Sequence, residues 1–83
     1  MMQPEEIERL IQEQLSDVRV EVSGDGRHFR AFIVSPDFQG LSRIQRHRLV
    51  NRALRAHIDS DTLHAISMRT LTPPEHEQQQ KAG

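Results

Sequence analysis

A β-hairpin is the feature that most narrows the folds open to this chain. Residues Val18 to Val22 alternate strictly between apolar and polar side chains, which is typical of a strand with one covered face. The following Ser23-Gly24-Asp25-Gly26 favours a tight turn, because glycine adopts positive φ without strain. A second strand is expected from His28 to Ser35, and Pro36 ends it. A sheet built on this hairpin needs helices to cover its apolar face.

Helical periodicity flanks the hairpin on both sides. Residues 4–15 begin with proline and glutamates, which suit a helix N-terminus, and continue with an apolar stripe. Ser42 is the expected N-cap of a long amphipathic helix that runs to about residue 58. A third strand is predicted over 63–71, with a short last helix after Thr72. The apolar stripe of the long helix consists of Ile44, Val50, Leu54 and Ile58, widened by Leu49 and Ala53.

The predicted order of elements is α-β-β-α-β-α. The crossover through the long helix allows the third strand to join the hairpin in parallel with one of its strands. The sequence therefore predicts an α/β (α+β) two-layer sandwich, in which helices stack on one face of a three-stranded sheet. No repeat or linker appears, so we expect a single domain over 1–83. Its ordered core is expected over about 4–76, with a frayed C-terminal tail over 77–83.

Composition excludes several classes of protein. The chain contains no cysteine, which excludes disulfides, thiolate metal sites and a cysteine nucleophile and fits a reducing, cytoplasmic setting. No signal-peptide pattern and no run of about 18 apolar residues occurs, so we expect neither export nor a membrane span. Ser42 and His47 have no nearby acid to orient the imidazole, and nothing else indicates a catalytic triad. We therefore expect a protein that is not an enzyme.

The five histidines raise the question of a metal site. His47 and His57 lie ten residues apart on one predicted helix, about 15 Å along its axis, and cannot share an ion. No spacing provides a closed site of three or four ligands. His28 and His64 each stand beside a loop at the start of a predicted strand. Two imidazoles at one edge could supply part of a coordination shell if a partner supplied the rest, although a hydrogen-bonded histidine at a strand end is the more usual outcome.

The long helix is strongly basic. It carries five arginines, and no acid occurs between Asp37 and Asp59, although the whole chain has a net charge of −1. Such a helix could lie against phosphates, as in helix-turn-helix or KH-like domains, or face solvent or an acidic protein. The Gly-x-x-Gly loop of KH domains is missing and no aromatic row for base stacking is evident, which favours protein or solvent. The candidate residues for a partner or nucleic acid are Arg43, Arg46, His47, Arg48 and Arg52.

Four stretches of the sequence form a recognisable pattern: Val22-Ser23-Gly24-Asp25-Gly26-x-His28-Phe29, Val34-Ser35-x-x-Phe38-x-Gly40, Arg46-His47-Arg48-Leu49-Val50, and Leu63-His64-Ala65 with Leu71-Thr72-Pro73. Through them the chain resembles the BolA family over about residues 5–76, and its short hairpin turn is most similar to the IbaG-type branch. The resemblance implies a fold akin to type II KH domains, which agrees with the order predicted above.

The resemblance also implies a function. Family members partner monothiol glutaredoxins, and the heterodimer can share a bridging [2Fe-2S] cluster whose other ligands are glutaredoxin cysteine and glutathione. His64 matches the family's cluster histidine, and His28 is the nearest candidate for the second ligand, which comes from the hairpin loop in the family. The resemblance thus implies an adaptor for iron–sulfur assembly or iron and stress regulation. It would carry no cofactor when isolated and would be a monomer or weak homodimer.

Two alternatives stay open. Family members have also been described as DNA-binding transcriptional regulators that use the region around 38–54, so DNA is an alternative partner. A cluster-free complex that regulates a partner is the other alternative.

Overall fold

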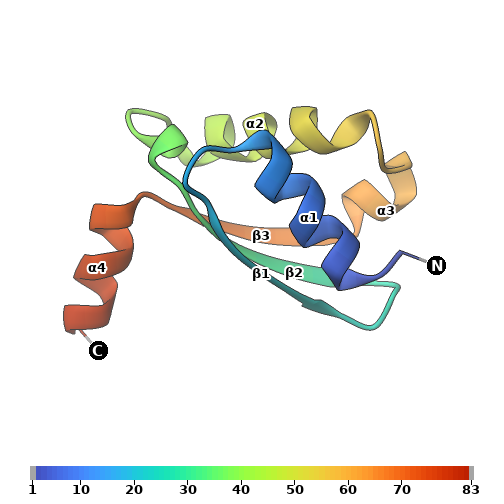
Figure 1. Cartoon of the computed structure of the whole chain (residues 1–83), viewed down its shortest axis with the longest axis horizontal. Helices are drawn as coiled ribbons and strands as arrows, with labels where there is room; N and C mark the ends of the chain where they lie inside the picture. Colours follow the sequence, from blue (N-terminus) through green and yellow to red (C-terminus); the bar gives the residue numbers. More distant parts are fainter. Residues whose placement is uncertain (1, 83) are drawn as a thin grey trace.

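Three strands form one mixed sheet in the computed structural model, which describes residues 2–82, and helices cover one face of that sheet (Figure 1). The strands are β1 (Arg19–Gly24), β2 (Phe29–Val34) and β3 (Ile66–Leu71). The helices are α1 (Pro4–Gln14), α2 (Arg43–Arg55), α3 (Ser60–His64) and α4 (Pro73–Ala82), with a 3-10 turn, η1 (Pro36–Phe38), after β2. Within residues 2–82, no helix combines the length and the apolar character that crossing a bilayer requires.

The sheet has the order β1-β2-β3. Strands β1 and β2 pair antiparallel as the predicted hairpin, and β3 pairs parallel to β2 through the crossover. Phe29 lies opposite Ile66, so β2 and β3 begin at the same end of the sheet. The predicted α+β class, with a three-stranded sheet under helices, is confirmed.

The core lies between the sheet and helices α1 and α2. Val20 lies between exposed neighbours in β1, and Ala31 and Ile33 are buried at alternate positions of β2. Each fully buried large apolar side chain stabilises the fold by roughly 1.5–3 kcal/mol relative to an exposed one. The largest fully buried side chains are Phe29, Phe38, Ile7, Ile11, Ile33, Leu54 and Val50.

The apolar stripe of α2 is narrower than the sequence predicted. Val50 and Leu54 are buried, and Ile58 is buried in the turn after the helix, but Ile44 is 63% exposed. Ile44 occupies the first turn of α2, one residue after the helix begins at Arg43. It lies about 120° from the inward direction of Val50 at 100° per residue, so including Ile44 in the core stripe was wrong.

A short helix, α3, precedes the third strand and was missed in the sequence. The prediction of strand from Leu63 was wrong, because β3 begins only at Ile66. Asp59 looked like the end of the long helix, yet its carboxylate accepts a hydrogen bond from the Thr62 N–H (2.8 Å) and caps a new helix. His64 therefore ends a helix instead of opening a strand.

Helix α4 departs from the stack of helices over the sheet. It extends past the end of β3 (Figure 1). Its His76 ring meets the Phe32 ring edge to face, with centroids 5.4 Å apart. Phe32 lies on the sheet face opposite the core, so the prediction that all helices share one face does not hold for α4. The helix continues to Ala82 where a frayed tail was predicted, and Gly83 lies outside the described residues.

Candidate functional site

The hairpin turn fixes the backbone on either side of His28. The N–H groups of Arg27 and His28 donate to the Asp25 carboxylate at 2.9 and 3.0 Å. These bonds, the one from His28 foremost, hold the pKa of Asp25 below its ordinary value. A side chain on Gly24 would stand 2.3 Å from the His28 carbonyl oxygen, so only glycine fits there. His28 itself is exposed.

His64 is placed by the short helix α3. The Asp59 cap starts the helix, and the Ala65 N–H closes it by donating to the Thr62 carbonyl oxygen at 3.0 Å. The side chain of Leu63 is buried, whereas the side chain of His64 is exposed. Because α3 is anchored at both ends, its last residue has a defined position at the start of β3.

The structure brings these two histidines to the same end of the sheet. The N–H of Phe29, which follows His28, donates to the carbonyl of Ala65, which follows His64, at 3.0 Å. The two backbones are thus hydrogen-bonded neighbours one residue away from each imidazole. Among residues 2–82, no three histidine or carboxylate side chains are grouped closely enough to hold a metal ion. Any metal at this end would need ligands from a partner.

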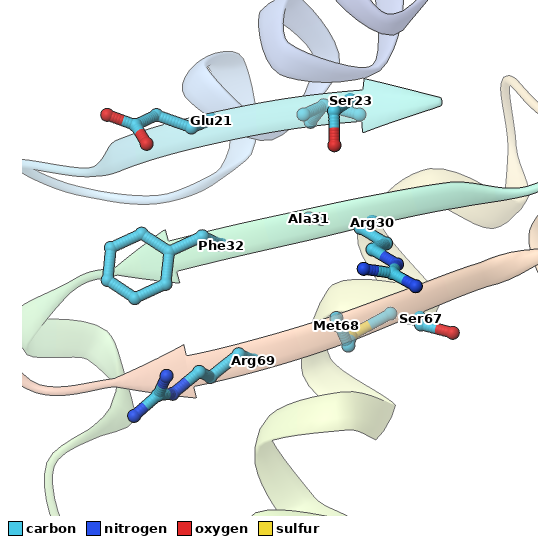
Figure 2. Close-up of a pocket in the computed structure, with 9 residues that line it drawn as sticks. Glu21, Ser23, Arg30, Ala31, Phe32, Ser67, Met68 and Arg69 are labelled. Carbon is cyan, nitrogen blue, oxygen red and sulfur yellow. The ribbon is translucent and has the colours of Figure 1, made fainter. Parts of the chain in front are cut away.

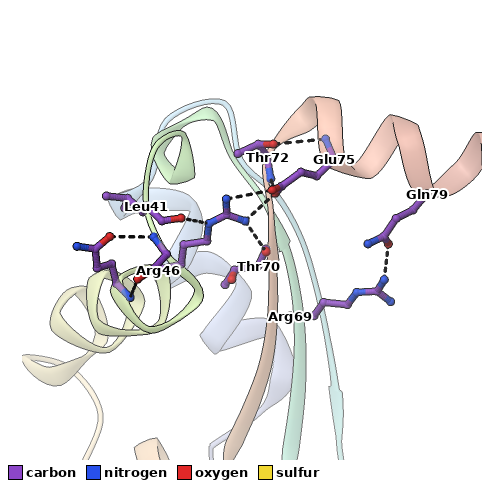
Figure 3. Close-up of polar contacts among 9 residues, drawn as sticks. Leu41, Arg46, Arg69, Thr70, Thr72, Glu75 and Gln79 are labelled. Carbon is purple, nitrogen blue, oxygen red and sulfur yellow. Dashed lines mark hydrogen bonds and ion pairs between the residues drawn. The ribbon is translucent and has the colours of Figure 1, made fainter.

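Arg46, one of the predicted docking residues, is instead used within the fold. Its side chain is only 12% exposed, and its NH1 and NH2 groups donate to the two Glu75 oxygens at 2.6 and 3.1 Å (Figure 3). The guanidinium also donates to the carbonyls of Leu41 and Thr70. Hydrogen bonding to Arg46 lowers the pKa of Glu75 to about 2. Arg46 therefore ties α2 to β3 and α4.

The remaining candidates on α2 point to different sides of the helix. Arg43 borders a hollow beside β3, whereas Arg48 and Arg52 border another one with Leu49. His47 is half-buried, and its Nε2 has no hydrogen-bond partner among residues 2–82. Burial, followed by the charge of Arg43, lowers the pKa of His47. Arg43 and the pair Arg48 and Arg52 thus do not share one side of α2, and Arg46 is used within the fold, so the structure does not favour the nucleic-acid alternative.

The family model described as "BolA-like protein" matches residues 10–75. The chain belongs to the BolA-like family. It is 36% identical over 74 residues to the acid stress protein IbaG of Escherichia coli, a match that covers 89% of this chain and 88% of that relative. The BolA-like family resemblance expected from the sequence is thus confirmed.

Solved structures of BolA-like proteins share the fold. A BolA homologue from Coxiella burnetii superposes with a TM-score of 0.81 at 44% identity, covering 93% of this chain and 99% of the other. BolA1 from Arabidopsis thaliana gives a TM-score of 0.73 at 30% identity, covering 90% and 98% of the two chains.

The Glu75 network is the part of this BolA-like fold that sequence reasoning missed. Thr72 and Glu75 form a reciprocal cap, in which the Thr72 N–H donates to the carboxylate at 2.8 Å and the Glu75 N–H donates to the threonine hydroxyl. The proline and acid after Thr72 predicted a helix start. No local signal indicated that Arg46, 29 residues earlier, shares the same carboxylate.

Proposed function

We propose that this BolA-like chain is a non-enzymatic adaptor that binds a monothiol glutaredoxin and shares a [2Fe-2S] cluster with it. The observation that carries the proposal is the position of His28 and His64. Both are exposed, and their neighbours Phe29 and Ala65 are hydrogen-bonded to each other at one end of the sheet. Such a pair is open to a partner protein and does not complete a site by itself.

The donor set fits one iron of a shared cluster. In Rieske-type centres two histidines replace two cysteines on one of the two irons. His28 and His64 would supply the two imidazoles, and each would bind as the neutral ring. A chain without cysteine cannot supply the two thiolates of the second iron. A glutaredoxin cysteine and a glutathione thiolate have the required chemistry.

Family membership supports a role outside catalysis. Residues 10–75 match the BolA-like model, and one relative carries the name acid stress protein. We propose that cluster sharing links this chain to iron–sulfur assembly or to iron and stress regulation. Arg48 and Arg52 are exposed on one side of α2 and would contribute to the docking surface, whereas Arg43 borders the hollow at the end of β3 and Arg46 supports the fold from inside.

Co-expression with a monothiol glutaredoxin tests the proposal. We expect a coloured heterodimer whose visible absorption and circular dichroism change when His64 or His28 is replaced by alanine. His57→Ala is the matched control, because His57 is also exposed but lies on the turn after α2 and not beside the hydrogen bond between Phe29 and Ala65. A spectrum that is the same in the wild type and the His64→Ala variant rules out His64 as a ligand.

Two further outcomes separate the alternatives. A heterodimer that forms equally well without iron indicates a cluster-free regulatory complex. Binding to DNA that weakens steeply with salt, and is lost when Arg48 and Arg52 are replaced by glutamine, indicates a nucleic-acid regulator.

A further inference from the structure

The sheet face opposite the core is largely uncovered. Helices α1, α2 and α3 lie on the other face, and α4 reaches this one only near the end of the sheet (Figure 1). Cross-strand pairing places the side chains of this face in rows across the three strands. One row consists of Ser23, Arg30 and Ser67, and the next consists of Glu21, Phe32 and Arg69. We call these six residues the open-face cluster.

The open-face cluster surrounds a hollow of about 420 Å³ (Figure 2). Its shape follows from side-chain size, because the short Ser23 and Ser67 flank Arg30 while the Phe32 ring rises in the next row. Phe32 is half-buried, and its far side is covered by His76 of α4. The hollow therefore combines an aromatic wall with hydroxyl and guanidinium donors, the mixture typical of a small-molecule site.

The hollow carries uncompensated positive charge. No carboxylate among residues 2–82 lies within ion-pair distance of Arg30 or Arg69, and Glu21 is paired with Arg19 at 3.4 Å. Arg69 donates a hydrogen bond to Gln79 of α4, which orients its guanidinium without neutralising it (Figure 3). The two arginines occupy adjacent rows on neighbouring strands, and their guanidinium groups point to opposite ends of the hollow, that of Arg30 towards Ser67 and that of Arg69 towards α4 (Figures 2 and 3).

We propose that the open-face cluster binds a small phosphate monoester. Guanidinium groups match the geometry of phosphate oxygens with two parallel hydrogen bonds each. Arg30 would hold the dianion, with the hydroxyls of Ser23 and Ser67 as further donors, and Arg69 would attract it from the other end of the hollow (Figure 2). The Phe32 ring would contact the organic part of the ester. This surface is distinct from His28 and His64, so the site does not depend on the proposed function.

A titration of the full chain with phenyl phosphate, followed by ¹H–¹⁵N NMR at constant ionic strength, tests the proposal. We expect saturable shifts at the backbone amides of the open-face cluster and none of comparable size on α1 or α2. Inorganic phosphate should bind the same residues more weakly, because it lacks a ring to contact Phe32. Equal binding of benzoate contradicts a phosphate site, as does the absence of saturable shifts.

Three variants sharpen the test. Arg30→Gln should weaken phenyl phosphate binding by at least about tenfold, the effect of losing a charge-assisted pair of hydrogen bonds, and Arg69→Gln should weaken it less, because only a longer-range attraction is lost. Arg48→Gln removes the same charge from the far side of α2 and should change the affinity by less than about twofold. If Arg48→Gln weakens binding as much as Arg30→Gln does, the interaction is general electrostatic attraction and the proposed site is wrong.

Discussion

At the scale of single residues, Arg46 and Glu75 join three elements that are far apart in the sequence. Arg46 is nearly buried and makes four hydrogen bonds, two of them to Glu75. When its carboxylate partner is removed, a buried guanidinium stays out of water, and no opposite charge offsets the free energy of its desolvation. This pair is therefore expected to contribute more to the free energy of unfolding than the exposed pair of Glu77 and Lys81.

Replacing Glu75 by glutamine should lower the free energy of unfolding at pH 7 by about 1–2 kcal/mol, a figure reduced by solvent because the carboxylate is 44% exposed. The folded pKa of Glu75, about 2, lies below its ordinary value of 4.5. Its stabilisation is thus complete above pH 4.5 and is lost as the pH falls towards 2. Urea unfolding at several pH values measures this, and Glu77→Gln serves as the control. A Glu75→Gln effect that is as large at pH 2 as at pH 7 contradicts the ion-pair account.

His47 should titrate below its ordinary pKa of 6.5. Burial disfavours the charged ring, and the neighbouring Arg43 adds repulsion. Because the folded pKa is lowered, protonation of His47 leaves the stability unchanged above pH 6.5 and destabilises the folded state as the pH falls below that value. NMR titration of the ring carbons measures the pKa directly. Arg43→Gln should raise it, and an unchanged value in that variant would show that the Arg43 charge has no influence.

At the scale of elements, two glycines that look alike in the sequence have different roles. A Cβ on Gly24 would meet the backbone of His28 at 2.3 Å, whereas Gly40, at φ +78°, has nothing within 4 Å. Gly24→Ala should therefore destabilise the hairpin by about 2 kcal/mol or more, through overpacking. Gly40→Ala should cost only about 1 kcal/mol, from left-handed backbone strain. Thermal unfolding of both variants tests the order, which would be reversed if backbone strain outweighed the clash.

The helices and strands with a clear hydrophobic periodicity could be predicted from the sequence, but the residues at which they begin and end could not. The alternation of Val18 to Val22 and the glycine turn predicted the hairpin correctly, because both signals are local. Asp59 carried an ambiguous signal, since the same residue type ends one helix and caps the next. The proximity of His28 and His64 depends on the parallel pairing of β2 with β3, which no short stretch of sequence specifies. The partners of Arg46, Thr70 and Glu75, are also far away in the sequence, so its place on the helix alone predicted a surface side chain.

At the scale of the whole molecule, the polar groups that hold the fold together are different from those that are exposed to solvent. The arginine that sequence reasoning placed in a docking surface holds α2, β3 and α4 together. The exposed imidazoles lie at the end of the sheet where β2 and β3 begin, and the open-face cluster lies on the sheet surface. A glutaredoxin docked at the end that carries His28 and His64 would leave most of the open face accessible, so we expect phenyl phosphate to bind the heterodimer and the free chain alike.

The central claim is that imidazoles of this chain ligate a cluster held jointly with glutaredoxin. Pulsed electron paramagnetic resonance of the reduced heterodimer tests it most directly, with only this chain's histidines labelled with ¹⁵N. We predict two strongly coupled ¹⁵N nuclei in the wild type and one in either His28→Ala or His64→Ala. A reduced cluster without any ¹⁵N coupling would contradict the account.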